Sequence, residues 1–280
     1  NKVVLVGVGQ IGASIGVNLV QKRLAREVIG VGRSQKNLRV AIRQKAIHRA
    51  GSQDDLSDAE LVVLATPVRG ILKYLRRGPA TSRGVLQYAP TLITDVGSTK
   101  ASLIKEATRR HLRFIGSHPI AGTEKAGAGA ADRDLFKGKK CILTSTPSSN
   151  PRDRKKMERL WRKFGSEPIW MDAKRHDRLL AAVSHLPHVV AYSLMMAVAR
   201  LISIPKDSKF ALGGLKDMTR IAQSSPEMWH DILLENKKNI LLCLKKFKGE
   251  LTKLESFIKR NDSPRLMAQL KKSQAIRRKF

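Results

Sequence analysis

The chain has 280 residues, of which 42% are hydrophobic, and it carries a formal net charge of +31. This length allows one large domain or two of ordinary size, and the composition is typical of a soluble globular protein and excludes a disordered chain. Its two cysteines, Cys141 and Cys243, form no C-x-x-C pair, which excludes a disulfide framework and indicates a reduced, cytoplasmic setting.

The positive charge has two interpretations. It is either a general surface bias or a field that concentrates anionic ligands. The last 45 residues carry 14 Lys and Arg against 3 Asp and Glu, a net of +11, so the C-terminal tail is basic while the remaining charge is spread out. With 5% aromatic residues and no zinc-finger spacing, a nucleic-acid partner is not expected.

The first predicted strand, KVVLVGV over residues 2–8, starts almost at once, so no secretory signal is expected before it. It leads into a G-x-G-x-x-G pattern and then a helix, the context of a dinucleotide-binding loop. Gly7 would permit the tight turn, Gly9 would let a pyrophosphate approach, and Gly12 would let helix and strand pack closely. The pyrophosphate would then lie at the helix start, near Gln10 and Ile11. The alternative is a tight turn without a ligand.

The second predicted strand, EVIGVGR over residues 27–33, indicates which dinucleotide binds. Enzymes that prefer NAD usually end this strand with an acidic residue on the ribose 2′-hydroxyl. Here Arg33 and Ser34 follow Gly32 instead. A guanidinium could pair with a 2′-phosphate and a hydroxyl could donate to it, so the sequence favours NADP over NAD.

Further strands alternate with helical segments up to about residue 172. The nearly continuous apolar runs are typical of strands covered on both faces of a parallel sheet. We therefore predict an α/β Rossmann domain over residues 1–172, with a mostly parallel, doubly wound sheet. The remaining predicted strands are 61–67, 91–97, 113–119, 141–147 and 167–172, and the predicted helices are 35–46, 68–77 and 157–164.

The rest of the chain, residues 173–280, reads as an all-α domain ending in the basic tail. Helices are predicted over 173–185 and 186–202, with Pro187 in the first turn of the second. A long helix from Ile240 carries one apolar stripe, which needs a partner surface in this domain or in another subunit. The stripe contains Leu244, Phe247, Leu251, Leu254 and Ile258. The longest apolar stretch, from Val189, is too short and interrupted to predict a membrane span.

Candidate reactive groups follow the predicted strands, because ligands of an open α/β sheet bind beyond the carboxyl ends of the strands. Thr66 and Pro67 would form a wall of the nicotinamide pocket. The segment DVGSTK presents Ser98, and GSHPIAGTEKAG presents His118. A histidine at a strand end suits a general base near the nicotinamide, although a hydrogen-bonded loop histidine would look the same.

These segments resemble the prephenate and arogenate dehydrogenases of tyrosine biosynthesis. The similarity runs from Lys2 to about Leu254 through GVGQIGASIG, LVVLATPV, TDVGSTK, GSHPIAGTEKAG, HDRLLAAVSHLPHVVAYSL and GGLKDMTRIAQSSPEMWHDILLEN. The resemblance implies a Rossmann domain followed by a helical domain that dimerises. It also implies oxidative decarboxylation of prephenate to 4-hydroxyphenylpyruvate and carbon dioxide with NAD(P), and no metal.

The resemblance also implies roles for individual residues. His118 would accept the proton of the ring C4 hydroxyl, and Ser98 would hydrogen-bond both that hydroxyl and His118. Arg220 would bind a substrate carboxylate. The other implied substrate-binding positions are His188, Glu124, Thr123, His176, Trp229 and Gly214.

Several alternatives stay open from the sequence. The substrate could be arogenate, since prephenate and arogenate differ only in a keto group against an ammonium. A β-hydroxyacid-type dehydrogenase would need a catalytic lysine on a helix of the second domain, where SHLPH offers histidines. A basic binding protein without activity would have lost the loop or the reactive groups. Trp229 could be plain core, and Arg220 a surface ion pair.

Overall fold

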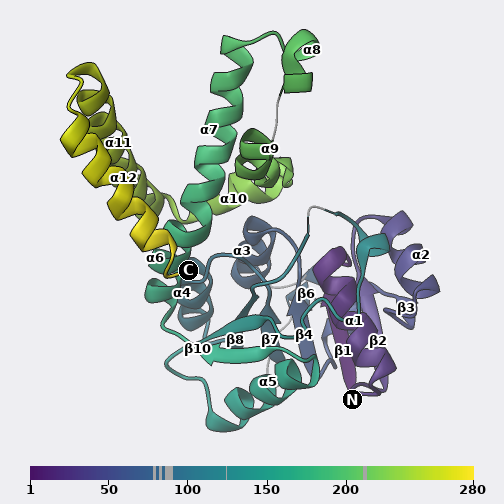
Figure 1. Ribbon diagram of the computed structural model, residues 1–280. Helices are drawn as coiled ribbons and strands as arrows, with labels where there is room; N and C mark the ends of the chain where they lie inside the picture. Colours follow the sequence, from purple (N-terminus) through teal and green to yellow (C-terminus); the bar gives the residue numbers. More distant parts are fainter. Residues whose placement is uncertain (78–79, 82–83, 86–90, 124, 211–212) are drawn as a thin grey trace.

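The first half of the chain forms an open sheet with helices on both faces (Figure 1). The computed structural model describes residues 1–77, 80–81, 84–85, 91–123, 125–210 and 213–280. Within these ranges, neighbouring strands of the main sheet pair in parallel, except that β9 runs antiparallel to β8. The order across the sheet is β10 (Glu167–Trp170), β9 (Lys140–Ser145), β8 (Phe114–Pro119), β7 (Leu92–Asp95), β4 (Leu61–Leu64), β1 (Lys2–Val6), β2 (Glu27–Val31) and β3 (Arg49–Ala50).

The seven predicted strands are all present, and the prediction of a mostly parallel doubly wound sheet is confirmed. The sequence did not predict β3 or the separate hairpin of β5 (Ala80–Thr81) and β6 (Gly84–Val85). Strands of two residues are too short to show an alternating pattern, so no sequence signal marks them.

The core lies on both faces of the sheet. In β1, Val3 and Leu5 belong to one apolar cluster and Val4 and Val6 to the other, because successive side chains of a strand point to opposite faces. The helices α1 (Gln10–Gln21), α2 (Gln35–Arg43) and α5 (Pro151–Lys163) contribute to the first cluster, and α3 (Val68–Arg77) and α4 (Ala101–Arg109) to the second. Two short 3₁₀ turns, η1 (Gln53–Leu56) and η2 (Ala128–Ala130), lie in the connections.

Helix α5 begins earlier than the predicted segment 157–164. The Asn150 side chain accepts the amide of Asp153 at 2.8 Å, and Pro151 occupies the first turn. Both are typical of a helix start, because they deal with amides that have no partner inside the helix. The apolar spacing alone located only the second half of the helix.

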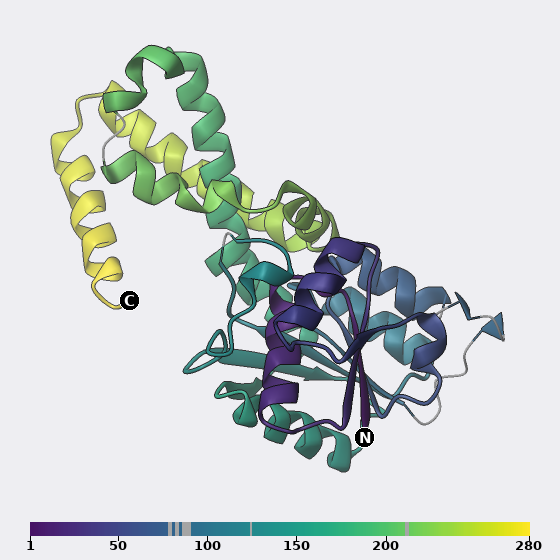
Figure 2. The same cartoon turned by 90° about the vertical axis from the view of Figure 1, so that its right-hand side faces the viewer.

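The second half of the chain is helical and lies at one end of the sheet domain (Figure 2). Asp172 accepts the amide of Arg175 and caps its first helix. The helices are α6 (Ala173–Leu180), the π-helical segment η3 (Ala181–His185), α7 (Leu186–Leu201), α8 (Ile204–Asp207), η4 (Ser208–Phe210), α9 (Gly213–Thr219), η5 (Arg220–Gln223), α10 (Pro226–Glu235), α11 (Lys237–Lys259) and α12 (Ser263–Arg277).

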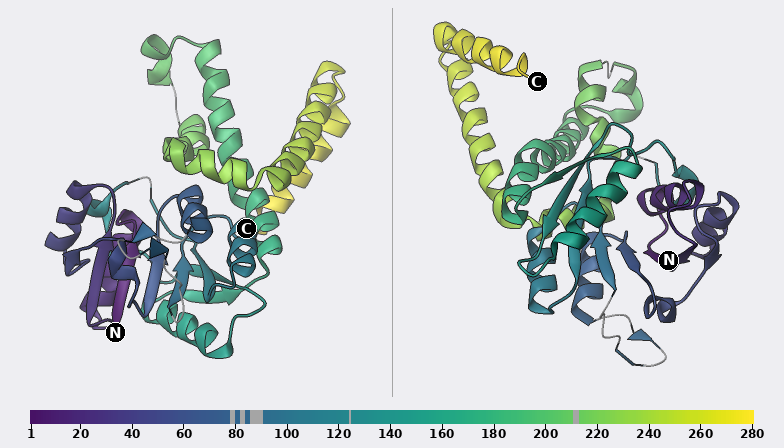
Figure 3. Two further views of the ribbon diagram at one scale, coloured as in Figure 1. Left: turned by 180° about the vertical axis from the view of Figure 1, so that it is seen from behind. Right: turned by 90° about the horizontal axis from the view of Figure 1, so that it is seen from below.

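Two arms project from this end of the sheet domain, one made by α7 and the other by the hairpin of α11 and α12 (Figures 1 and 3). We call them the α7 arm and the α11–α12 arm. Residues 237–280, which make the second arm, bury one hydrophobic side chain, Ile240, and α12 buries none. The arms therefore expose apolar side chains that the chain itself does not cover.

The sequence predicted two helices over 173–185 and 186–202, and the structure joins them. The π-helical segment joins α6 to α7, so one continuous helix of 29 residues runs over Ala173–Leu201, and it is long and apolar enough to cross a membrane. Only 22% of its most apolar window is buried within the chain. Core helices of soluble proteins pass the same test of length and composition, so this helix is weak evidence for a membrane span.

Candidate active site

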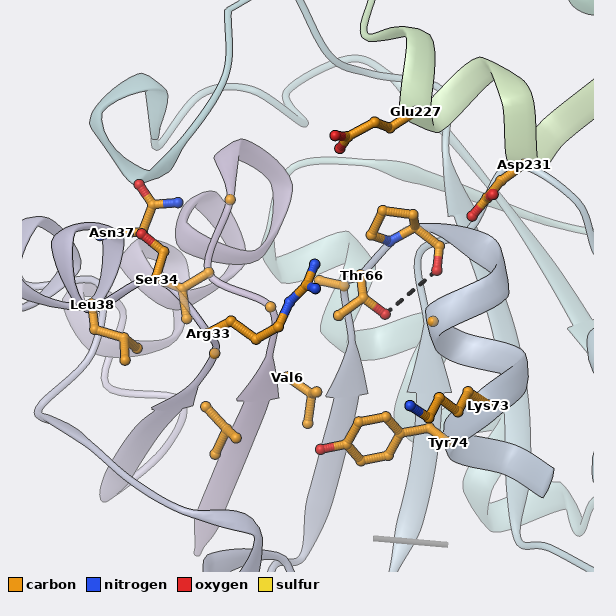
Figure 4. A pocket seen from close by; sticks show the side chains of 18 of the residues that line it. Val6, Arg33, Ser34, Asn37, Leu38, Thr66, Lys73, Tyr74, Glu227 and Asp231 are labelled. Atoms are coloured by element: carbon orange, nitrogen blue, oxygen red, sulfur yellow. Dashed lines mark hydrogen bonds between the residues drawn. The ribbon is translucent and has the colours of Figure 1, made fainter. Parts of the chain in front are cut away.

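A cavity of about 1580 Å³ opens beyond the carboxyl ends of β1, β2 and β4 (Figure 4). The helical half closes it from the other side with residues of α10. Its lining includes Gly7, Gly9, Gly32, Arg33, Ser34, Asn37, Thr66, Pro67, Lys73, Tyr74, Pro226, Glu227, His230 and Asp231. The predicted cofactor positions Thr66 and Pro67 therefore lie in the wall of this cavity.

The three loop glycines behave as their spacing predicts. Gly7 has φ +95°, and a Cβ there would lie 2.6 Å from the carbonyl oxygen of Ala65. A Cβ on Gly12 would lie 2.1 Å from the carbonyl oxygen of Gly7, so only glycine lets helix α1 approach the turn this closely. At Gly9 the space within 4 Å is open. This cradle fits a dinucleotide pyrophosphate.

The end of β2 presents a cation to the cavity. The Arg33 side chain extends into it, and Lys73 and Tyr74 of α3 reach the same space (Figure 4). Ser34 accepts the amide of Asn37 at 3.2 Å and so caps α2, which leaves its hydroxyl hydrogen free to donate to a ligand. The residues here suit an anionic group on the adenosine ribose.

The loop after β8 is tied to the glycine loop. The Gln10 side-chain amide donates to Thr123 Oγ1 at 2.7 Å, and Gln10 Oε1 accepts the Thr123 amide at 3.1 Å. Two predicted site residues, one for the cofactor and one for the substrate, therefore bind each other. Glu124, the next predicted substrate residue, lies outside the described residues.

His118 lies near the end of β8 and is buried, with 9% of its surface exposed. Its Nδ1 lies 2.8 Å from Nε2 of His176, and Nδ1 of His176 lies 2.8 Å from a carboxylate oxygen of Asp177. His176 and Asp177 come from α6, so this chain of hydrogen bonds joins the helical half to the sheet domain. His176 was expected among the substrate contacts, and the structure brings it against the predicted base instead.

Burial is the main reason why the pKa of His118 lies well below its usual range, with further lowering by His176 and by Lys100. Burial also lowers the pKa of His176, against the opposing effect of Asp177. Both imidazoles are therefore neutral near pH 7, which is the state in which a histidine can accept a proton.

Ser98 lies in the loop between β7 and α4 and is half-buried. The expected hydrogen bond from Ser98 to His118 is not found among the described residues, where Nδ1 of His118 is paired with His176. Because α6 packs against α4, His176 occupies the place beside His118 where Ser98 was expected. The sequence predicted contacts only among residues that follow strands, so it did not include this one.

A buried ion pair beneath the site was also missed. Lys100 and Asp95 contact each other through Nζ and Oδ2, and neither side chain is exposed. Asp95 also accepts the amides of Gly97 and Ser117. Removing either partner would be strongly destabilising, because it would leave an isolated buried charge. The only sequence signal was an acid and a lysine within DVGSTK.

A second group of predicted residues meets on α7, η5 and α10. The rings of His188 and Trp229 stack at 3.7 Å, and Arg220 lowers the pKa of His188, after the larger effect of burial. The ring centroids of His185 and Trp229 lie 5.8 Å apart. His185 also lowers the pKa of His118, so this histidine interacts with both groups. Gly214 is exposed near the start of α9.

Trp229 is buried, yet its indole N–H has no hydrogen-bond partner among the described residues. Buried indole N–H groups normally find an acceptor, since leaving one unpaired costs free energy. Trp229 thus packs as a buried ring against His188, with a donor that is sealed from solvent.

Two family models match this chain. The model described as "Prephenate dehydrogenase, nucleotide-binding domain" matches residues 15–169, and "Prephenate dehydrogenase, dimerization domain" matches residues 172–272. The prephenate dehydrogenase of Bacillus subtilis is 32% identical over 281 residues, which cover 98% of this chain and 75% of that protein. The cyclohexadienyl dehydrogenase of Zymomonas mobilis is 34% identical, covering 80% of this chain and 76% of that protein.

Solved structures with similar folds include two from the same group of enzymes. Prephenate dehydrogenase from A. aeolicus, in complex with hydroxyphenyl propionate and NAD+, superposes with a TM-score of 0.89 at 32% identity, covering 99% of this chain and 97% of that one. Synechocystis arogenate dehydrogenase superposes with a TM-score of 0.79 at 27% identity, covering 100% and 99%.

Proposed function

The chain belongs to the prephenate dehydrogenase family, and we propose that it converts prephenate to 4-hydroxyphenylpyruvate and carbon dioxide. Membership makes it an NAD(P)-dependent oxidoreductase of tyrosine biosynthesis. The observation that carries the proposal for the substrate is the junction of the two halves. A neutral histidine at the end of β8 lies there against His176 of the helical half, which also carries the cation Arg220.

Each of these residues has its own role in the reaction. His118 accepts the proton of the ring C4 hydroxyl, and Ser98 hydrogen-bonds that hydroxyl. Arg220 binds one carboxylate of the substrate through its planar fork of N–H donors, with His188 and Trp229 in the same wall. A dinucleotide held with its pyrophosphate in the glycine cradle would supply a nicotinamide that accepts the hydride from C4. Loss of the ring carboxylate as carbon dioxide then restores aromaticity.

For the cofactor we propose a preference for NADP. Arg33 and Lys73 place two cations on the cavity where the adenosine ribose would lie, and no acidic residue ends β2. Their charge suits a 2′-phosphate and does not replace the carboxylate that an NAD ribose prefers.

We also propose that two copies associate through the arms in a homodimer that acts in the cytoplasm. The arms expose apolar side chains that a partner would bury, among them Met196, Leu201, Leu241, Leu242, Leu251, Ile258, Met267 and Leu270. One of the matched family models is itself described as a dimerization domain.

The first test measures NADPH and NADH formation by absorbance, with prephenate and then with arogenate as substrate. We expect turnover of prephenate that falls about 10²–10⁴-fold in His118→Asn, while cofactor binding measured by fluorescence is unchanged. The matched control is His111→Asn, because His111 is exposed and its φ of 50° is a conformation that asparagine tolerates well. Turnover of arogenate alone would overturn the choice of substrate, and normal turnover by His118→Asn would overturn the role of His118.

Two arginines test the two binding regions separately. Arg220→Ala should lower kcat/KM for prephenate by about 10–150-fold, mainly through KM, because it removes charged hydrogen bonds to a carboxylate. Arg33→Ala should lower the preference for NADP over NAD at least about tenfold. Arg39→Ala, on the exposed side of α2, is the control for Arg33. An unchanged KM for prephenate, or an unchanged cofactor preference, would contradict the corresponding assignment.

A further inference from the structure

The chain of hydrogen bonds behind His118 determines where its hydrogens are. An ionised carboxylate can only accept, so Nδ1 of His176, 2.8 Å from Asp177, must carry a hydrogen and donate it. Because His176 is neutral, its Nε2 then has a free lone pair. Nδ1 of His118, 2.8 Å away, must therefore be the donor in the next hydrogen bond.

This leaves Nε2 of His118 as the nitrogen with a lone pair. It has no protein partner among the described residues, and it is not among the polar atoms there that are both sealed from solvent and unpartnered. The His118 imidazole therefore has one nitrogen that can accept a proton, Nε2, and this nitrogen is accessible to a ligand.

We propose that Asp177, acting through His176, is the positioning residue that holds His118 in the tautomer with a proton-accepting Nε2. This inference rests on the proposed function, in which His118 takes the substrate's proton. In the proposed mechanism, Asp177 contacts neither the substrate nor the cofactor. Its role is to orient two imidazoles in series.

The position of Asp177 is itself held by the sheet domain. Its two carboxylate oxygens accept the amides of Lys100 at 2.8 Å and Ala101 at 2.9 Å, at the start of α4. The N-terminus of a helix favours a negative charge, so these two amides suit a carboxylate that accepts hydrogen bonds. The backbone oxygen of Asp177 accepts a hydrogen bond from Asn236. With its side chain 3% exposed and that of His176 fully buried, neither group has freedom to turn.

His118 can then take up a proton while the hydrogens between His118, His176 and Asp177 stay where they are. When Nε2 of His118 accepts the hydroxyl proton, the ring becomes an imidazolium with hydrogens on both nitrogens. Nδ1 continues to donate to His176, and the carboxylate of Asp177, one imidazole further on, stabilises the new positive charge. The electron pair of the broken O–H bond stays on the substrate oxygen and forms the C4=O bond as the hydride leaves C4, so His118 gains the one proton that the hydroxyl loses.

The other groups around His118 make this stabilisation necessary. Lys100 of the segment before α4 and His185 of the π-helical segment both disfavour a positive charge on the ring. Cys141 of β9, across the sheet from His118, stays a thiol because burial raises its pKa well above the usual range. Asp95 of β7 is already engaged by Lys100. Asp177 is thus the carboxylate connected to His118 by hydrogen bonds.

The test uses Asp177→Asn, in which a side-chain amide can donate to His176 and reverse both tautomers. Because wrong tautomers cost about 10⁴ in a comparable histidine site, we expect kcat to fall about 10²–10⁴-fold with little change in KM. The limb of the kcat–pH profile that reports His118 should also move. The matched control is Asp153→Asn, a buried carboxylate at the start of α5 that pairs with Arg113 and Asn150 and lies outside the histidine chain. It should lower stability and leave the pH profile unchanged.

A second readout does not depend on activity. In protein labelled with ¹⁵N-histidine, the His118 resonances, assigned by their loss in His118→Asn, should show a protonated Nδ1 in the wild type and a protonated Nε2 in Asp177→Asn. A wild-type ring protonated at Nε2, or an Asp177→Asn enzyme with normal kcat and pH profile, would overturn the proposal. The wild-type spectrum decides even if the variant does not fold. Absent prephenate turnover with the expected spectra would refute the proposed function and leave the tautomer assignment supported.

Discussion

The sheet domain and the two arms bury their apolar residues in opposite ways. In the sheet domain, alternate residues of one strand reach two covered faces, and Trp161 is 1% exposed. In the α11–α12 arm, Leu251 is 49% and Ile258 62% exposed, and α12 has no buried residue. The sheet domain therefore completes its core within one chain, whereas the arms need a second surface.

The candidate active site lies where the sheet domain meets the base of the helical half, from which the two arms project. The sheet domain contributes His118, the glycine loop and the start of α4. The helical half contributes His176, Asp177 and the wall around Trp229. A reaction at this junction thus depends on the sheet domain for its cofactor and on the helical half for the geometry of its base.

The largest expected change in stability tests whether the sheet domain buries its core within one chain. Trp161 packs edge-on against Phe136 and Phe164 and donates to Ser117, so Trp161→Ala should lower the free energy of unfolding by about 3–5 kcal/mol in urea titrations. Leu270→Ala in α12, already 52% exposed, should cost less than about 1 kcal/mol in the monomeric protein. Equal losses would contradict the contrast between the two regions.

The next effect tests the need of the arms for a partner. Leu251→Glu combined with Ile258→Glu places two charges on one face of α11, which a dimer would have to bury. We expect the dimer dissociation constant to rise about 100-fold, equivalent to about 3 kcal/mol, in sedimentation velocity runs over a range of concentrations. Lys105→Gln with Lys155→Gln changes the net charge equally on the sheet domain and should leave association unchanged. A dimer of wild-type strength in the α11 variant would show that this face is not the interface.

The pH dependence of stability, an effect of intermediate size, tests the junction between the sheet domain and the helical half. Burial lowers the pKa of His185 from 6.5 to about 4, so the unfolded chain binds a proton between these values that the folded chain does not. Stability is therefore present above pH 6.5 and is lost as pH falls from about 6.5 toward 4. This histidine alone should cost about 2 kcal/mol between pH 7 and pH 5. Denaturation in His185→Gln should show a smaller loss, and an equal loss would assign the effect to other groups.

The smallest effect tests the exposed surface of an arm. Glu255 and Lys259 form an i,i+4 pair on α11 with side chains 60% and 72% exposed. Solvent screens such pairs, so Glu255→Gln should change stability by less than about 0.5 kcal/mol, with the difference disappearing in 1 M salt. A loss above 1 kcal/mol, measured by thermal unfolding, would show that the pair is covered in the assembled protein.

Several features followed from local residue patterns because they depend on neighbours in the chain. The loop at Gly7, Gly9 and Gly12 was predictable, since the tight turn and close helix approach need glycine whatever lies elsewhere. The strands were predictable from their apolar runs, and so was the position of His118 at a strand end. The early start of α5 was also encoded, in Asn150 and Pro151, but apolar spacing alone did not reveal it.

The sequence by itself determined the kind of fold, the cofactor loop and the residue types available for chemistry. Only the tertiary structure decided that His118 pairs with His176, 58 positions away, rather than with the nearer Ser98, and that Asp177 rests on the first amides of α4. The reason is physical: a hydrogen bond between distant segments exists only once packing holds both groups at the right distance and away from competing water. The same packing joined α6 to α7 through a π-helical segment and left the arms uncovered.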